Sequence, residues 1–298
     1  MRAAYLGPRG TNSHAVLLAA GLGADEHVER PTVGAVVEAV QSGAVERGVV
    51  PIENSRAGAV ATTLDALVFD APDVVIVGEL VHQVAYCLTA AESIACDEVR
   101  TVHSHPQASG QCARFLSAQL PGAAVIAAAS TAGAVRAVAE GDTLAGAPPH
   151  AAIGTHHAAR LYGAVVLAEG IEDDADNATR FAWIARADAP AVPPAAPGPT
   201  GAAPAHGGLA PAPKTVLVFW GGGDVAPGWL VGCLGEFSSR AINLTRIESR
   251  PRRIGLGHYM FFCDLEGAVE DPGVAAAIAG LRGRCEAVRV LGSFPTAA

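Results

Sequence analysis

The sequence lacks the features that would place the chain in a membrane, outside the cell or on nucleic acid. Its longest uncharged alanine-rich run, AAVIAAASTAGAV, is too short and too small in side-chain volume to span a bilayer. The opening segment MRAAYLGPRGTNSH has no apolar stretch of secretory length before glycine and proline interrupt it. Lysine and arginine form no block, and the net charge is −9. We therefore expect a cytoplasmic protein without membrane or nucleic-acid partners.

Cysteine pairs of the CxxC type are also absent. The six cysteines lie singly in apolar segments such as GQCARFL and FFCDLEG, a pattern typical of buried thiols in a reducing compartment. We expect neither zinc ligands nor a disulfide framework among them.

One segment, residues 187–213, contains almost no large apolar side chains. It reads ADAPAVPPAAPGPTGAAPAHGGLAPAP, so it cannot pack a core. We interpret it as a linker between a domain of residues 1–186 and a domain of residues 214–295. A chain of 298 residues is long enough for both domains to have cores of their own.

Residues 1–186 repeat one pattern, in which a β-rich run, a short polar loop and a helical run follow one another. RAAYLG, ERGVVPI and EVRTVH lead in this way into AVLLAAGL, AVATTLDAL and ASGQCARFLSAQL. The alternation predicts a parallel α/β architecture, in which ligands bind beyond the carboxyl ends of the strands. The loops there carry Thr11, Asn12 and Ser13, then Glu53, Asn54 and Ser55, then Ser104, His105 and Gln107. Together these side chains and the helix amino termini suit a small anion, although each residue type is also an ordinary helix cap.

Residues 214–295 predict strands and helices in the order βαββαβ. KTVLVFW, INLTRIESR, GHYMFFCDLEG and AVRVLGSF have the strand pattern, whereas WLVGCLGEFSSR and DPGVAAAIAGLRGRC have the helical one. This order is that of the ferredoxin-like α+β fold, which serves many functions and by itself assigns none.

Five motifs, in this order, resemble the prephenate dehydratase family over almost the whole chain: YLGPRGTNSH, GVVPIENSRAGAV, SHPQASGQC, DNATRF and INLTRIESRP. The resemblance implies a two-lobed α/β catalytic domain, similar to type II periplasmic binding proteins, with a cleft between the lobes. Lobe one would comprise about residues 1–78 and 165–186, and lobe two about residues 79–164. Residues 214–295 would be an ACT domain, which is a ferredoxin-like effector-binding module.

The same resemblance implies an activity. The family converts prephenate to phenylpyruvate, water and carbon dioxide on the route to phenylalanine, without a metal or an organic cofactor. It implies association as a homodimer or homotetramer, with phenylalanine as the effector.

Carried onto this sequence, the motifs imply catalytic roles for Thr179, Asn54, Ser104 and Gln111. Thr179 would face the leaving hydroxyl group, while the other three would hold the substrate. The implied substrate-binding residues are Thr11, Ser13, Glu53, Ser55, Arg180 and Phe181.

Several of these residues have structural interpretations as well. Arg180 follows the threonine directly, should point to the opposite face of the strand and is equally suited to an ion pair with a neighbouring acid. Glu53 could brace its loop, and Phe181 could anchor its strand in the core. His14 and His105 could donate protons near neutral pH or brace loops.

The first motif departs from the family at Asn12, where the family has phenylalanine in GTFS and this chain reads GTNS. The change leaves arogenate or a modified prephenate open as the substrate. The ENS and TRF motifs are retained, which favours dehydration over decarboxylation alone. An alternative from another class is a non-catalytic amino-acid sensor or solute-binding protein with the same two lobes.

Two motifs imply an effector site, with Gly228, Trp229, Leu230, Glu248, Ser249, Arg250 and Pro251 as its residues. ESRP is intact, but PGWLV stands where the family reads close to PGALV. Because an indole replaces a methyl group at Trp229, we expect weakened or altered phenylalanine feedback. Alternatively, the indole packs into the helix–sheet core or a subunit interface and leaves the pocket free.

Overall fold

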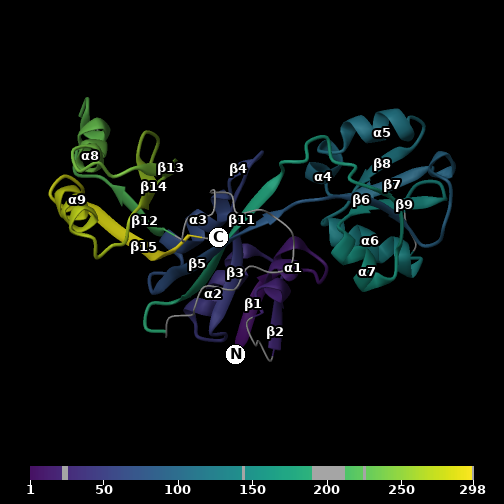
Figure 1. Cartoon of the computed structure of the whole chain (residues 1–298), viewed down its shortest axis with the longest axis horizontal. Coiled ribbons are helices and arrows are strands. Elements are labelled where there is room, and N and C mark those ends of the chain that lie inside the picture. The colour runs from purple at the N-terminus through teal and green to yellow at the C-terminus, as the bar shows by residue number, and fades with distance from the viewer. Residues whose placement is uncertain (22–25, 143–144, 190–211, 224–225, 297–298) are drawn as a thin grey trace.

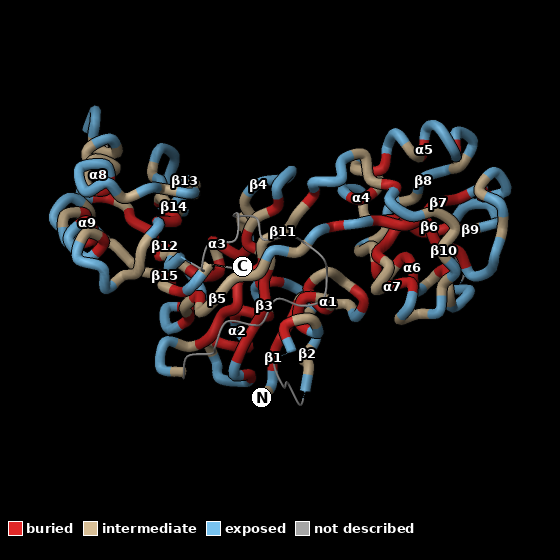
Figure 2. Tube along the Cα trace, viewed as in Figure 1, coloured by how far each residue is buried: buried red, intermediate tan, exposed pale blue. Residues whose placement is uncertain are grey.

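The computed structural model describes residues 1–21, 26–142, 145–189, 212–223 and 226–296, which form three β-sheets (Figure 1). The sheets lie in a row, with the amino-terminal sheet in the middle and the carboxy-terminal sheet at one end. Buried residues concentrate in the sheets and on the inner sides of their helices (Figure 2). Among the described residues, no helix is both long and apolar enough to cross a membrane.

The central sheet has the strand order β2-β1-β3-β11-β5, with the short strand β4 beside β3. Only β11 runs against its long neighbours, β3 and β5. Its elements are β1 (Arg2–Leu6), α1 (Asn12–Ala19), β2 (Glu26–Arg30), α2 (Val33–Gln41), β3 (Arg47–Asn54), β4 (Gly58–Ala59), α3 (Ala61–Phe69), β5 (Val74–Gln83) and β11 (Ala178–Arg186). Helix α1 packs over one face, and α2 and α3 pack over the other.

The second sheet has the order β10-β6-β9-β7-β8, in which only β6 runs against its neighbours. Its elements are β6 (Cys87–Ala90), the 3₁₀ helix η1 (Cys96–Glu98), β7 (Thr101–Ser104), α4 (Pro106–Gly110), α5 (Ala113–Gln119), β8 (Ala124–Ala127), α6 (Thr131–Glu140), β9 (His150–Gly154), α7 (His156–Tyr162) and β10 (Val165–Glu169).

The predicted strand–loop–helix units and the parallel α/β architecture are confirmed, with β6 and β11 among the strands that run against their neighbours. The chain leaves the central sheet after β5 and returns to it as β11, so the returning strand pairs in the reverse direction. The predicted lobe boundaries shift for the same reason. Residues 79–83 stay in the central sheet because β5 pairs with β11 along its whole length, whereas residues 165–169 pair with β6 in the second sheet.

The carboxy-terminal sheet is antiparallel, with the order β13-β14-β12-β15. Its elements are β12 (Pro213–Trp220), α8 (Trp229–Ser238), β13 (Leu244–Pro251), β14 (Tyr259–Glu266), α9 (Pro272–Arg282) and β15 (Ala287–Pro295), which confirms the predicted βαββαβ order. Residues 190–211 of the predicted linker lie outside the described residues.

Both faces of this sheet are buried. Leu217 and Phe219 on β12 pack against helices α8 and α9. The alternate residues, Val216 and Val218, join a single apolar cluster with Leu64 and other residues of the central sheet and its helices. The central and carboxy-terminal sheets therefore share a hydrophobic core, because side chains alternate between the two faces of a strand.

Candidate active site

The ENS and TRF motifs meet at the point where β3 ends and β11 begins. Thr179 pairs with Asn54 across the two strands, and Arg180 pairs with Glu53. Asn54 is buried, and its Nδ2 lies 3.0 Å from Oγ1 of Thr179. The antiparallel register thus brings together two side chains that are far apart in the sequence.

An amide chain continues this contact toward the second sheet. Nδ2 of Asn54 donates to Oδ1 of Asn177 at 2.9 Å, and Nδ2 of Asn177 donates to Oε1 of Gln111 at 2.9 Å. Gln111 ends α4, and its backbone carbonyl accepts from the amide of Asp173 at 2.7 Å. The cluster formed by Asn54, Thr179, Asn177 and Gln111, here called the amide cluster, therefore links the two sheets.

The hydrogen-bond directions in the amide cluster follow from its chemistry. Oδ1 of Asn54 accepts from the backbone amides of Arg56 and Ala57 at 3.1 and 2.9 Å, which fixes Nδ2 on the Thr179 side. An amide nitrogen only donates, so Oγ1 of Thr179 can only be the acceptor in their contact, in which the two Nδ2 hydrogens are shared with Oδ1 of Asn177 and the carbonyl of Ala178. The hydroxyl proton of Thr179 is consequently available to another acceptor.

Asn177 is a residue that the motifs in the sequence did not single out. It is only 2% exposed and lies at the centre of the amide cluster. Its position inside DNATRF, two residues before Thr179, was the available signal.

The acidic segment before β11 braces the passage between the sheets. Oε2 of Glu172 accepts from the amide of Tyr86 at 2.8 Å, and Oδ1 of Asp173 accepts from the amide of Arg114 at the start of α5. Asp174 forms an exposed ion pair with Arg56. The run of acids thus connects both crossing segments.

The loop between β1 and α1 contacts α7 of the second sheet. Nδ1 of His14 lies 3.0 Å from Nε2 of His157, and the hydroxyl of Tyr162 donates to the carbonyl of Arg9 at 2.6 Å. Burial, with help from His157 and Arg9, lowers the pKa of His14 to about 4. His14 therefore stays neutral at pH 7 and braces the contact between the two sheets, as one of its two predicted interpretations had it.

Three residues that were predicted to contact the substrate have protein partners in the structure. Ser104 is fully buried and donates to the carbonyl of Ile153 at 3.0 Å, because β7 and β9 are neighbours. Phe181 is 2% exposed and packs in the α1-side core. Arg180 points to the face of β11 opposite Thr179, where it binds acids instead of a ligand.

In the first loop, Thr11 has the helix-capping role that was one of its two interpretations. The hydroxyl of Thr11 donates to the carbonyl of Leu6 at 2.9 Å and accepts from the amide of His14, so it acts as the cap of α1. Ser13 is buried, and Oδ1 of Asn12 is a buried acceptor without a hydrogen-bond partner. Ser55 bridges to the 172–176 segment and β11, since its hydroxyl donates to the Asp176 carbonyl.

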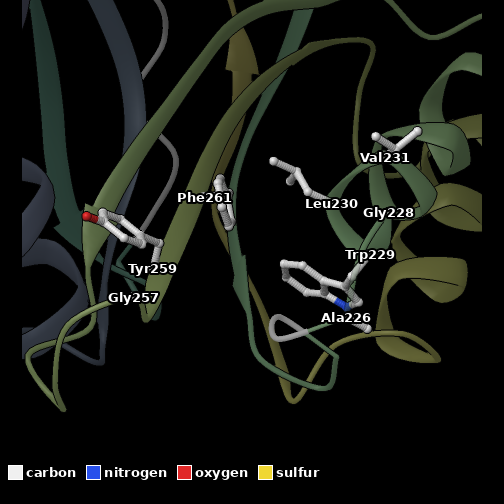
Figure 3. A pocket seen from close by; sticks show the side chains of 8 residues that line it. All are labelled: Ala226, Gly228, Trp229, Leu230, Val231, Gly257, Tyr259 and Phe261. Carbon is white, nitrogen blue, oxygen red and sulfur yellow. The ribbon is translucent and has the colours of Figure 1, made fainter.

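A cavity of about 180 Å³ lies beside the carboxy-terminal sheet, between the start of α8 and β14 (Figure 3). The predicted effector residues Gly228, Trp229 and Leu230 line it, together with Ala226, Val231, Gly257, Tyr259 and Phe261. The indole of Trp229 packs near the rings of Phe219 and Phe261, and its Nε1 donates to the carbonyl of Arg284 at 3.0 Å. Trp229 is thus both a wall of the cavity and part of the helix–sheet packing.

The ESRP residues lie on β13 and do not line this cavity. The guanidinium group of Arg250 instead binds both carboxylate oxygens of Asp65 on α3, at 3.0 and 2.9 Å. Among the described residues, no group of three His, Cys, Asp or Glu side chains has the arrangement of a metal site.

Comparisons with known proteins identify the family. The family model for prephenate dehydratase matches residues 3–189. The prephenate dehydratase of Mycolicibacterium vanbaalenii is 39% identical over 307 residues, covering 98% of this chain and 90% of that protein.

Two of the solved structures that cover all of this chain share its fold closely. Prephenate dehydratase from Arthrobacter aurescens, in complex with L-Phe, has a TM-score of 0.82 and 34% identity over 90% of that chain. GqqA, described as a novel type of quorum-quenching acylase, has a TM-score of 0.80 and 27% identity over 98% of that chain. The family model, the relatives and the first of these structures agree. The chain belongs to the prephenate dehydratase family, and its activity is that of a hydro-lyase.

Proposed function

We propose that the amide cluster is the catalytic centre and that Thr179 assists departure of the ring hydroxyl of prephenate. The observation that carries this proposal is the direction of one hydrogen bond. Because Asn54 can only donate to Oγ1 of Thr179, the threonine proton is free to point at the leaving oxygen. The same bond from Asn54 polarises the Thr179 hydroxyl, which makes it a better donor.

The reaction needs little more from the protein. The bond between the ring and its carboxylate breaks, its electrons enter the ring, and the bond from the ring to the hydroxyl group breaks on the opposite side. The products are carbon dioxide, water and phenylpyruvate, with one proton taken up by the departing hydroxide. Aromatisation drives these steps, so the enzyme has to orient the dianion and donate hydrogen bonds as charge develops on oxygen.

Neutral donors suit this task. Amides and hydroxyls bind a carboxylate without adding a cation that would stabilise the ground state as strongly as the transition state. We assign Asn177 and Gln111 to this role, with the amino terminus of α1 and Ser13 as donors from the first loop. As in type II periplasmic binding proteins, the two lobes would close over the substrate along the segments that cross between them.

We further propose that residues 214–295 form an ACT domain that binds phenylalanine and associates with a second copy of the chain. Three features support the effector site: the βαββαβ order, the cavity beside Trp229, and the L-Phe complex of the Arthrobacter aurescens protein. The indole occupies the wall where the family has a methyl group, so phenylalanine binding would be weak in this chain.

The catalytic proposal is tested by following phenylpyruvate formation from prephenate with the wild type, Thr179→Ala and Thr179→Ser. We expect kcat to fall by about 10²- to 10³-fold in Thr179→Ala, and Thr179→Ser to recover most of the loss because it keeps the hydroxyl. Near-wild-type kcat in Thr179→Ala would remove Thr179 from the mechanism. Faster turnover of arogenate than of prephenate by the wild type would make arogenate the substrate.

The effector proposal is tested by calorimetry with phenylalanine on the full chain. We expect weak binding by the wild type and at least about tenfold tighter binding by Trp229→Ala, which enlarges the cavity. Tight binding and full inhibition of the wild type would contradict the predicted effect of Trp229.

A further inference from the structure

Six charged side chains gather on the face of β11 opposite Thr179. They are Glu53, Glu79 and Arg180 of the central sheet, and Lys214, Arg246 and Asp264 of the carboxy-terminal sheet. Three cations and three anions make this group, here called the ionic cluster, formally neutral. Lys214 is the only lysine in the sequence, and its Nζ lies 2.7 Å from Oε1 of Glu79. Side chains of the two sheets thus form ion pairs with one another across the boundary between the sheets.

Arg180 is the centre of the ionic cluster. Its Nη2 lies 2.7 Å from Oε2 of Glu53 and 2.8 Å from Oδ2 of Asp264, and its Nη1 lies 3.0 Å from Oε2 of Glu79. Arg180 therefore has a partner on each of β3, β5 and β14. Such an arrangement holds the guanidinium group, and with it the strand that carries it, in one place.

Asp264 is the most deeply buried member, at 1% exposure. Its other oxygen, Oδ1, lies 2.9 Å from Nη2 of Arg246. Burial alone would raise the pKa of Asp264, but Arg246 and Arg180 hold that pKa below its usual value. The carboxylate is therefore ionised, and its removal would leave two buried cations with one partner fewer.

The backbone of β3 and β11 connects the ionic cluster to the amide cluster. Arg180 and Glu53 are a cross-strand pair, and Thr179 and Asn54 are the next pair along, with side chains on the opposite face. The register to β3 shifts between Arg180 and Phe181, whereas pairing with β5 continues through Ala178. The ion pairs of Arg180 therefore add to the strand pairing in fixing where Thr179 points, on the side where the ladder to β3 is irregular.

We propose that Asp264 is a positioning residue for the dehydratase reaction, acting through Arg180 on the Thr179–Asn54 contact. The carboxy-terminal sheet then supplies part of the support of the active site, beyond any effector that it binds. The proposal rests on the catalytic role proposed for Thr179.

The test compares two losses of a carboxylate at the same boundary between the sheets. Asp264→Asn removes the acid that faces Arg180. Asp65→Asn is the matched control, because Asp65 binds Arg250 and Arg253 of the carboxy-terminal segment but belongs to α3 and contacts neither β3 nor β11 through these bonds. Both variants should lower Tm. We expect kcat with prephenate to fall by about 10- to 100-fold in Asp264→Asn, with KM within about twofold, and Asp65→Asn to keep both within about twofold.

Two further variants guard against a folding defect. Arg246→Met with Asp264→Asn removes opposite charges together and keeps the ionic cluster neutral, so it should fold where the single variant does not. We expect kcat of this double variant to fall as much as that of Asp264→Asn. Asp264→Glu restores a carboxylate and should recover most of the activity, which recovery of bulk stability alone would not require.

Wild-type kcat in folded Asp264→Asn, or in the double variant, would overturn the proposal. So would a fall in Asp65→Asn as large as that in Asp264→Asn, because it would indicate general loosening of the sheet contact. The variant Thr179→Ala distinguishes failure of the catalytic role of Thr179 from failure of the positioning role of Asp264. If that variant stays active, the catalytic assignment fails; if it is inactive while Asp264→Asn is active, only the positioning role fails.

Discussion

The two faces of the β3–β11 pair carry opposite chemistry at consecutive residues. On one face Asn54 and Thr179 meet as neutral groups, and on the other Glu53 and Arg180 meet as ions. The neutral face joins the amide cluster, while the charged face joins the carboxy-terminal sheet. Under the proposed function, this contrast lets an acidic chain hold a dianion. The charges of the ionic cluster are neutralised behind the strand, and the amide cluster offers neutral donors to the substrate.

Placing a charge on the neutral face should have the largest effect. Asn54→Asp is nearly isosteric, but a carboxylate cannot donate to Thr179 or Asn177 and would repel the substrate. We expect kcat/KM for prephenate to fall by about 10³-fold or more. Initial rates of phenylpyruvate formation measure this, with circular dichroism to verify folding. Retention of a tenth of the wild-type value would mean that the neutrality of this face is unimportant.

Removing the side chain at the centre of the amide cluster should cause the next largest loss of activity. Asn177→Ala leaves Gln111 and Asn54 without their shared partner. We expect kcat/KM to fall by about 10- to 100-fold and the free energy of unfolding by about 1–3 kcal/mol. Steady-state kinetics and urea denaturation measure the two quantities. Asp176→Ala, an exposed neighbour in the same loop, serves as the control and should change neither. Equal effects of the two substitutions would contradict the central place of Asn177.

Removing a charge from the charged face should lower activity less than either substitution on the neutral face. Glu53→Gln is the isosteric counterpart of Asn54→Asp at the adjacent position, and Arg180 keeps Glu79 and Asp264 as partners. We expect kcat to fall by about two- to fivefold and stability by about 1 kcal/mol. Kinetics and thermal unfolding under the same buffer conditions allow the direct comparison. A loss as large as that of Asn54→Asp would erase the distinction between the faces.

The smallest effect concerns pH, at the contact between the two lobes. The pKa of His14 is lowered to about 4, mainly by burial and then by His157 and Arg9, and His27 adds to the shift. A histidine whose pKa is lower in the folded state binds protons preferentially when unfolded. Stability should therefore be constant above pH 6.5 and decline as pH falls from about 6.5 toward 4.

Thermal unfolding across this range measures the decline, with His14→Gln as the comparison. The variant should lose part of the pH dependence because glutamine does not titrate. Carboxylates contribute at the acid end of the range, so the difference between the two curves, rather than either curve alone, is the informative quantity. Superimposable slopes would exclude His14 as the titrating group.

The sequence predicted the elements well where the information is local. Helix α1 begins directly after Thr11, whose side chain accepts a hydrogen bond from the backbone of the first turn. Strand direction was not predictable, because β11 has the same alternation whichever way it pairs. Asn54 and Thr179 were identified from separate motifs, but their contact depends on that direction.

The hydrogen bond of Ser104 is a contact that the sequence did not indicate. Its motif and loop position favoured a substrate contact, yet the carbonyl of Ile153 on the neighbouring strand takes its hydroxyl proton. Only the strand order, in which β7 and β9 are neighbours, reveals that acceptor.

The order of residues along the chain was enough to specify the family, the βαββαβ order of the last third and the fact that Arg180 and Thr179 face opposite ways. These follow from motif order, turn and cap residues, and the two-residue period of a strand. The partners of the side chains on each face of β11 were decided by the packing of the folded chain. Asn177 and Gln111 join Thr179, and Asp264 joins Arg180, only because sheets from distant parts of the chain pack side by side. Local propensities do not encode which buried group becomes another's partner, since that depends on packing of the whole apolar core.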